Sequence, residues 1–358
     1  MKLDMSPQIL PQENGLDVGP INGLFRDVSS TYKFYWFLSI LDEVEAGNTS
    51  IPMERLTERM LQWTWYPVLV CRLSFGVSDS IPAVLSELQR LYNDDAPTHT
   101  EIHAITQTSK DFKEKIKNLR RYVPYRFLSP WNLSSSDTQV RRQSQNFKNN
   151  CLYSIRGASI EINPNWISYF KKHLGILRDF TYWHLCQYLQ KKNPNVPNIA
   201  GKIIPLAKRA PLTKQTKFWN EILAAHPMHC IYSGAMLGPA DYELDHFVPW
   251  SFVSHDQLWN LIPATATVNA AKSDRLPDLD FYLPRYAAFQ LDALRFYIHH
   301  HEAKKPSELL EDYCAVHLTV EEICKIPEDK FESQLRSNFS PMIEIASNMG
   351  FVSNWRYS

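Results

Sequence analysis

The chain has 358 residues, of which 44% are hydrophobic and 21% are charged, an ordinary globular composition with room for two domains. The N-terminal residues contain no apolar signal-like core, and the most apolar stretches are too short to span a bilayer, so we expect a cytoplasmic protein without a membrane segment. The six cysteines are scattered and form no C-x-x-C pair, which favours buried free thiols over disulfides or a zinc knuckle.

The net charge is zero, but basic and acidic residues are distributed unevenly along the chain. Residues 1–109 carry 7 Lys/Arg against 14 Asp/Glu, residues 110–220 carry 21 against 5, and residues 221–358 carry 10 against 19. A basic block of this size is typical of a segment that binds a polyanion. The alternative is a set of solvated helix faces whose Lys and Arg pair with the acidic ends of the chain, and charge alone does not decide between the two.

Hydrophobic periodicity predicts helices through most of the chain. In order, the predicted helices cover residues 31–47, 52–71, 81–94, 109–123, 167–192, a short stretch near 213–226, 289–305, 306–318 and the tail from 340. The aromatic residues of the first two helices follow one helix face, which favours a packed core over a base-stacking surface. The polar segment 131–150 is predicted as a long surface loop or boundary, and 193–202 as a linker.

Convincing strand patterns occur only between residues 229 and 266. "YELDHFV" alternates as a short strand does, "PWSFVSHDQLW" is a loop, "NLIPAT" is a second strand and "ATVNAAKSD" is a short helix. A unit this small cannot bury much core, so we expect it to pack on a larger scaffold. The predicted fold class is therefore mainly α, a helical body with a small embedded strand-loop-strand-helix module.

This module resembles the signature of the HNH endonucleases. "LDHFVP" is followed by Asn260, fifteen residues after Asp245, by Asn269 nine residues later, and by Lys272 three further on. The local sequence is most similar to the HNH domain of CRISPR RNA-guided effector nucleases and of bacterial HNH proteins like it. The similarity covers about residues 229–278, so no guide RNA is implied. It implies a ββα-metal fold here and metal-dependent hydrolysis of phosphodiester bonds in DNA.

The resemblance also implies a role for each motif residue. Asp245 and Asn269 would bind one Mg²⁺ or Mn²⁺ ion, since hard cations prefer oxygen ligands. His246 would be the general base that takes a proton from the attacking water. Asn260 would hold the loop or the imidazole in orientation, and Lys272, one helical turn after Asn269, could reach a phosphate. By itself the Asp245-His246 pair is more typical of a hydrogen-bonded surface pair.

One departure from the family concerns zinc. Many HNH proteins fasten this fold with a structural zinc ion held by two C-x-x-C pairs. Here Cys230 is the only cysteine at those positions, because Ser233, Thr265 and Val268 occupy the other three. We therefore predict no structural zinc, a module held by aromatic and aliphatic packing, and Cys230 as a core thiol.

The basic block lies directly upstream of the module, which favours a nucleic-acid track with largely sequence-independent binding. The predicted nucleic-acid-binding residues are Lys113, Lys117, Arg120, Arg121, Arg141, Arg142, Lys171 and Lys172. The predicted domains are a helical N-terminal domain (1–130), a basic helical and linker region (131–225), the HNH module (226–285) and a helical C-terminal region (286–358).

The predicted partner is DNA, in double-stranded form. One module makes one nick, so a double-strand break would require a homodimer or two binding events, and an activator or partner subunit is also compatible with the sequence. Bacterial proteins that resemble this one in architecture often act in defence against phage or mobile DNA. The alternative is a non-catalytic nucleic-acid-binding or assembly subunit that retains the fold, although the intact Asp/His/Asn/Asn set favours an enzyme. His255 and Asp256, in the loop over the site, could contact substrate or metal.

Overall fold

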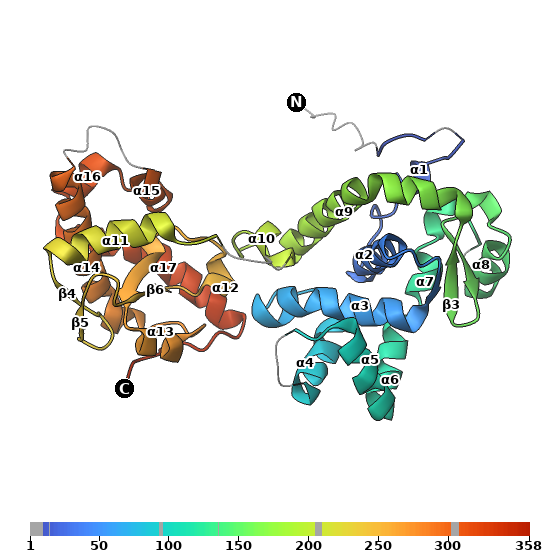
Figure 1. Ribbon diagram of the computed structural model, residues 1–358, viewed down its shortest axis with the longest axis horizontal. Coiled ribbons are helices and arrows are strands. Elements are labelled where there is room, and N and C mark those ends of the chain that lie inside the picture. The colour runs from blue at the N-terminus through green and yellow to red at the C-terminus, as the bar shows by residue number, and fades with distance from the viewer. Residues whose placement is uncertain (1–9, 14, 93–95, 135, 205–209, 302–307) are drawn as a thin grey trace. The chain divides into compact units, whose positions relative to one another are not determined.

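The computed structural model of the chain contains two compact units (Figure 1). The structure describes residues 10–13, 15–92, 96–134, 136–204, 210–301 and 308–358. The N-terminal unit consists of residues 1–194 and 202–205, and the C-terminal unit of residues 195–201 and 206–358. The division falls within residues 193–206, whereas the domains predicted from the sequence are 1–130, 131–225, 226–285 and 286–358.

The N-terminal unit is mainly helical. At its centre α2 (Tyr32–Glu45) packs against both α3 (Met53–Trp65) and α9 (Pro164–Lys192), and Figure 1 shows α2 between the other two. The other helical elements of this part of the chain are α1 (Gly19–Asn22), the π-helix η1 (Tyr66–Val70), α4 (Ile81–Leu91), α5 (His99–Thr108), α6 (Lys110–Leu119), α7 (Val123–Arg126), η2 (Ser129–Trp131), α8 (Asp137–Ser144) and η3 (Lys148–Asn150). Helix α10 (Ala200–Ile203) contains residues of both units.

The aromatic residues of α2 form a packed core and not a base-stacking surface. Phe34, Trp36 and Phe37 are completely buried. The Trp36 indole still finds a polar partner, because its Nε1 donates a hydrogen bond to Tyr153 Oη at 3.2 Å. Helix α2 lies between two other helices, so most of its faces are apolar, and this explains why its sequence is so rich in large side chains.

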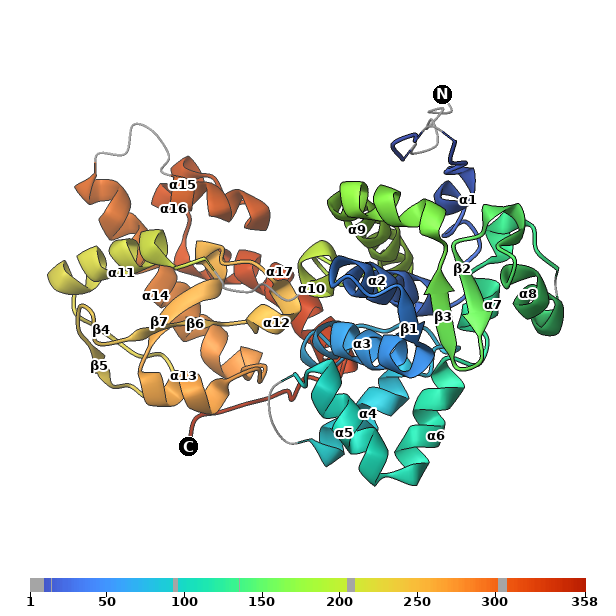
Figure 2. The same cartoon turned by 45° about the vertical axis from the view of Figure 1, so that its right-hand side comes forward.

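A small antiparallel sheet in this unit lies outside the region where strands were predicted. Its order is β1-β3-β2, formed by β1 (Ser50–Pro52), β2 (Tyr153–Arg156) and β3 (Ser159–Ile162) (Figure 2). Strands β2 and β3 are joined by a two-residue turn in which Gly157 takes a φ of 59°, a backbone conformation that glycine adopts without strain. Strands of three or four residues carry too few alternations to be separated from loop by pattern alone.

The segment 131–150, predicted as a loop, contains the helix α8. Only Val140 and Ser144 of α8 are buried, so its sequence shows almost no apolar periodicity. Ser144 Oγ accepts a hydrogen bond from Ile155 N at 3.1 Å, which attaches the helix to β2. Tertiary contacts of this kind, and not intrinsic pattern, decide the conformation of such a polar segment.

The C-terminal unit surrounds the predicted module with helices. The strands are β4 (Met228–His229), β5 (Met236–Leu237), β6 (Glu243–His246) and β7 (Leu261–Ala264), which form the antiparallel pairs β4-β5 and β6-β7. The helical elements are α11 (Thr213–Ala225), α12 (Trp250–Val253), η4 (Leu258–Asn260), α13 (Ala266–Lys272), α14 (Leu279–His300), α15 (Glu308–Glu311), η5 (Asp312–Val316), α16 (Val320–Lys325) and α17 (Glu328–Asn348). The predicted strand, loop, strand and helix therefore occur in the predicted order.

One continuous hydrophobic core joins the module to the helices that follow it. Phe339 of α17 packs against Phe247 and Trp259, with ring centroids 4.8 Å and 5.5 Å apart. Tyr286 of α14 packs against Phe247 at 4.4 Å. The predicted boundary between residues 285 and 286 falls inside α14, because the module alone is too small to bury a stable core and shares that of α14 and α17.

Three of the four positions at which many HNH proteins carry zinc-binding cysteines are occupied here by residues that pack in the core or cap a helix, and the fourth, Ser233, is exposed. Cys230 is buried in the core. Thr265 is the N-cap of α13, where its Oγ1 accepts a hydrogen bond from Val268 N at 3.4 Å, and Val268 itself is fully buried. Tyr232 packs edge-on against Tyr282 at 4.9 Å.

Two further predictions concern the whole chain. All six cysteines are free, and Cys71, Cys151 and Cys230 are buried, but Cys314 and Cys324 are exposed, so burial of the thiols is only partly confirmed. Across the described part of the chain, none of the helices combines the length and the apolar character that crossing a membrane requires.

Candidate active site at the end of strand β6

The candidate site is built on the β6-β7 pair and on α13, which packs against β6 (Figure 2). In this pair Asp245 lies opposite Ile262 and His246 lies opposite Leu261. Every residue of β7 is buried, whereas β6 runs from the exposed Glu243 to the buried Asp245 and His246. Strand β7 thus anchors β6 in the core and brings its polar end to the start of the following loop.

The carboxylate of Asp245 is only 2% exposed and both of its oxygens are hydrogen-bonded. Oδ2 accepts a hydrogen bond from Tyr232 Oη at 2.7 Å, and Oδ1 accepts one from Lys272 Nζ at 2.9 Å. Burial beside this carboxylate raises the pKa of Tyr232 well above its usual range, so the phenol stays protonated and remains a donor. A buried charge requires partners of this kind.

Lys272 lies inside the site and does not face solvent. Its side chain is fully buried, and besides Asp245 its Nζ contacts the backbone oxygen of His246 at 2.6 Å. The sequence suggested that Lys272 shares a face with Asn269 and reaches a phosphate. In the structure its ammonium group is instead paired with the carboxylate of Asp245, and both side chains are buried.

His246 is held by a carboxylate from the following loop. Its Nε2 lies 2.8 Å from Asp256 Oδ1, whereas its Nδ1 makes no hydrogen bond to any residue that the structure describes. An ionised carboxylate only accepts hydrogen bonds, so Nε2 is the donor in this contact, and in the neutral imidazole Nδ1 then carries a lone pair. The loop around Asp256 is itself fixed, since Gln215 Nε2 donates to the Asp256 backbone oxygen at 3.0 Å.

The side chains of Asn260 and Asn269 make different contacts. Asn260 is fully buried and makes two hydrogen bonds of 2.9 Å to the backbone of Val248, donating from Nδ2 to its oxygen and accepting from its N–H at Oδ1. This ties the loop after β6 to the start of β7. Asn269 donates from Nδ2 to Glu243 Oε2 at 2.7 Å, and its amide oxygen has no hydrogen bond to a described residue.

The eight predicted nucleic-acid-binding residues differ in their surroundings. Lys117 is paired with Glu114 at 3.2 Å and Lys172 with Glu13 at 3.0 Å. Lys113 contacts a glutamine, Arg120 is half-buried near several glutamates, and Arg141 donates to the backbone oxygen of Gly157. Five of the eight are exposed and have no carboxylate partner within the described residues, and the side chains of three of these, Arg121, Arg142 and Lys171, also make no hydrogen bond to a described residue.

Part of the basic block is neutralised by the acidic first third of the chain. Lys115 pairs with Glu87 at 2.6 Å, and Arg178 pairs with Asp42 at 2.7 Å. These contacts support, for several residues, the alternative in which the basic segment pairs with the acidic ends. Among the eight predicted residues, the polyanion interpretation applies most directly to Arg121, Arg142 and Lys171, whose side chains have no hydrogen-bonding partner among the described residues.

Comparison with known proteins identifies the module. Residues 230–278 match the model of a family described as HNH endonuclease. The matched segment is the one that carries the sequence resemblance, so the protein is a mainly helical chain with an embedded HNH module. No curated protein and no solved structure gives a significant match to the chain.

HNH nucleases generally use a divalent metal ion, and the donor groups here fit one. Each oxygen of the Asp245 carboxylate accepts one hydrogen bond and retains a further lone pair, and the amide oxygen of Asn269 is not engaged by a described residue. Carboxylate and amide oxygens suit Mg²⁺ or Mn²⁺. Over the described ranges no three or more His, Cys, Asp or Glu side chains are grouped to hold a metal ion, so the protein donors would be few.

Sequence reasoning left two contacts of the site unassigned. Glu243 lies two residues before Asp245 and therefore on the same side of β6. This spacing in the sequence could have identified Glu243 as a residue of the site. Asp256 was named only as a loop residue that could contact substrate or metal, yet its carboxylate contacts His246. It is ten residues from His246 in a loop without periodicity, so no pattern relates the two.

The Lys272–Asp245 pair leads to a stability prediction. Replacing Lys272 with methionine keeps the length of the side chain and removes its charge, which leaves the Asp245 carboxylate buried beside an apolar group. Breaking a buried ion pair in this way costs about 3–5 kcal/mol, and we expect the free energy of unfolding of the C-terminal unit to fall by that amount. Chemical denaturation followed by tryptophan fluorescence measures it.

The matched control is Lys217→Met, the same change at an exposed position of α11. It is expected to alter the unfolding free energy by about 0.5 kcal/mol or less. Equal stability of the two variants would contradict a buried Lys272–Asp245 pair.

Proposed function

We propose that the protein is a metal-dependent HNH endonuclease that hydrolyses phosphodiester bonds in DNA and makes one nick per protomer. The observation that carries the proposal is the arrangement at the end of β6, where a carboxylate-bound imidazole lies next to a buried carboxylate within the segment that matches HNH endonucleases. Activation of a water molecule requires a general base, for which an imidazole with a free lone pair is suited, and a carboxylate that would bind the metal ion.

His246 is the general base of this proposal. A water molecule at Nδ1 would transfer its proton to that nitrogen as its oxygen attacks phosphorus. The Asp256 carboxylate accepts the Nε2–H bond, which keeps the ring in the required tautomer and orientation and stabilises the imidazolium that forms. Asp256 acts through His246 and is therefore a positioning residue.

Asp245 and Asn269 are the residues that would hold the Mg²⁺ or Mn²⁺ ion. When bound, such an ion neutralises charge on the phosphate and assists departure of the leaving oxygen. Lys272 and Tyr232 fix both oxygens of Asp245 in place through their hydrogen bonds. Glu243 orients the amide of Asn269 through its contact with Nδ2, and Asn260 holds the loop that follows His246.

The biological setting is proposed on the resemblance alone. The local sequence is similar to nuclease modules of bacterial systems that act against phage or mobile DNA, which supports a role in defence. A single module cuts one strand, so cleavage of both strands would require a homodimer, a second binding event or a partner subunit.

The nuclease proposal is tested directly on supercoiled plasmid. We expect the purified protein with Mg²⁺ to produce nicked circles, EDTA to abolish the reaction, and His246→Ala to lower the rate by roughly 10²-fold or more, because the general base is removed. His299→Ala, an exposed histidine of α14, is the matched control and should cleave like the wild type. Nicking that survives His246→Ala would contradict the mechanism, and absence of nicking in the wild type would favour the non-catalytic alternative.

Asp256 has its own test. Asp256→Asn retains the shape and an acceptor oxygen but removes the charge, so we expect kcat to fall roughly 10-fold or more while KM changes little. In the His246→Ala background the same substitution should have no additional effect. The control is Asp241→Asn, an exposed residue before β6. An equal further decrease in rate in the His246→Ala background would show that Asp256 acts independently of the imidazole.

We propose that DNA affinity comes from Arg121, Arg142 and Lys171, exposed cations of the basic block whose side chains make no hydrogen bond to a described residue. Removing one cation that neutralises a phosphate should reduce the slope of log K against log salt by about 0.9, so replacing all three with glutamine should reduce it by roughly 3. Fluorescence anisotropy with a labelled duplex over a range of salt concentrations measures this slope. The control replaces the paired residues Lys117 and Lys172. An unchanged slope in the triple variant would exclude these residues as DNA ligands.

A further inference from the structure

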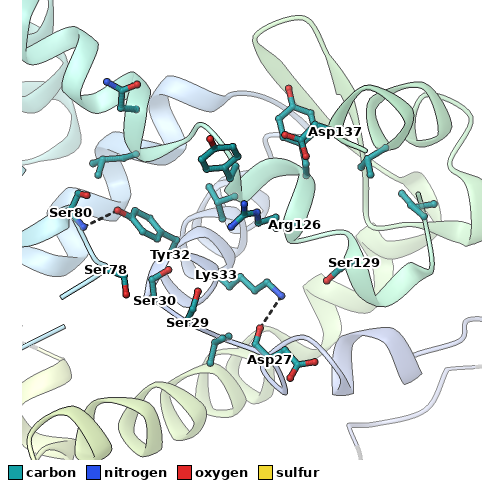
Figure 3. A pocket seen from close by; sticks show the side chains of 18 of the residues that line it. Asp27, Ser29, Ser30, Tyr32, Lys33, Ser78, Ser80, Arg126, Ser129 and Asp137 are labelled. Atoms are coloured by element: carbon teal, nitrogen blue, oxygen red, sulfur yellow. Dashed lines mark hydrogen bonds between the residues drawn. The ribbon is translucent and has the colours of Figure 1, made fainter. Parts of the chain in front are cut away.

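The N-terminal unit contains a cavity of about 810 Å³ that the nuclease proposal does not use (Figure 3). It lies between the residues that lead into α2, the end of α6, helix α7 and the segment that leads into α8. Its volume is in the range of sites that enclose a small molecule, and such sites are usually largely preformed. All of its lining residues belong to the N-terminal unit.

Two cations lie in this cavity without a carboxylate partner. Lys33 Nζ contacts only the backbone oxygen of Asp27, at 3.4 Å, and the Arg126 guanidinium lies over the ring of Tyr122 at 4.5 Å. Neither forms an ion pair with a carboxylate among the residues with described positions. Figure 3 shows the two side chains next to each other at the centre of the cavity.

The two charges act on each other. Burial lowers the pKa of Lys33, the Asp27 carboxylate opposes this, and the nearby Arg126 charge lowers it further. Two like charges in one partly buried space are unfavourable unless an anion lies between them. Bound phosphate would relieve both the repulsion and the desolvation, since lysine and arginine are the usual phosphate ligands.

The other residues that line the cavity indicate which class of anion it would bind. Serine hydroxyls from three segments face the cavity, among them Ser30, Ser78 and Ser129, and hydroxyls donate to phosphate oxygens. Two carboxylates, Asp27 and Asp137, also line it and would repel a bare anion. They are compatible with a ligand that offers hydroxyl donors as well as phosphate, as a ribose does.

Aromatic rings complete the lining. Tyr32, Tyr122 and Tyr125 border the cavity, and Tyr122 is 42% exposed. The Tyr122 ring already carries the guanidinium groups of Arg126 and Arg121, at 4.5 Å and 5.1 Å from its centroid, so a planar base would stack on Tyr32 or Tyr125. Phosphate ligands, carboxylates for sugar hydroxyls and aromatic rings together match the three parts of a nucleotide.

We propose that this cavity binds a nucleotide, with its phosphates at Lys33 and Arg126 and its base against the tyrosines. The nucleotide could be free or could be the end of a single strand. Duplex DNA presents its phosphates on a convex surface and does not enter an enclosed cavity. The proposal is independent of cleavage, because it concerns residues of the N-terminal unit alone.

Isothermal titration of the full chain with ADP, GDP, CDP and UDP, without divalent metal, tests the proposal. We expect at least one of these nucleotides to bind. The dissociation constant of the matching nucleoside, which lacks the phosphates, should be at least about tenfold higher. Lys33→Met and Arg126→Gln should each weaken binding by about tenfold, whereas Arg90→Gln, an exposed arginine of α4 outside the cavity, should change it by no more than about twofold. Circular dichroism confirms that each variant is folded.

A 5′-phosphorylated single-stranded oligonucleotide distinguishes a site for a free nucleotide from a site for the end of a single strand. Displacement of the bound nucleotide by this oligonucleotide would assign the cavity to a strand end, and failure to displace it would assign the cavity to a free nucleotide. Absence of binding by all four diphosphates, or equal binding in wild type and both cavity variants, would overturn the proposal. A chain that binds a nucleotide but does not nick plasmid would leave this proposal intact and reject the nuclease proposal.

Discussion

The candidate site depends on the burial of one carboxylate. Asp245 is almost inaccessible to water, and a charge in that position is tolerated only with partners at both oxygens. Tyr232 comes from the segment between β4 and β5, and Lys272 from the end of α13, so the two contacts hold three parts of the module around one strand end. The groups that would perform the chemistry are thus also groups that stabilise the fold.

The C-terminal helices stabilise the module, which lacks the zinc-binding cysteine pairs of many HNH proteins. The short strands and α13 are too small to form their own core, and α14 and α17 supply the missing apolar surface through Tyr286 and Phe339. Gln290 of α14 adds a polar attachment, since its Nε2 donates to the backbone oxygen of Leu261 in β7 at 2.7 Å. The C-terminal helices are therefore part of the scaffold that positions the site.

The local sequence was sufficient to predict the order of strand, loop, strand and helix in the module, because side-chain spacing along a strand or helix determines which residues share a face. It was insufficient for contacts between distant or aperiodic segments. The Lys272–Asp245 pair and the Asp256–His246 contact depend on how loop and helix pack, as do the β2-β3 hairpin and α8. Charge counts likewise could not separate exposed Lys171 from Lys172, its neighbour, which is paired with Glu13.

The central claim is that Asp245, despite its buried contacts, is the carboxylate that binds a divalent ion in the HNH module. Electron paramagnetic resonance of Mn²⁺ titrated into the wild type and into Asp245→Asn tests it most directly. The wild type should bind one Mn²⁺ ion per chain, and the affinity should fall by about tenfold or more in Asp245→Asn, because an amide is a weaker ligand than a carboxylate. Identical stoichiometry and affinity in the two proteins would contradict the claim.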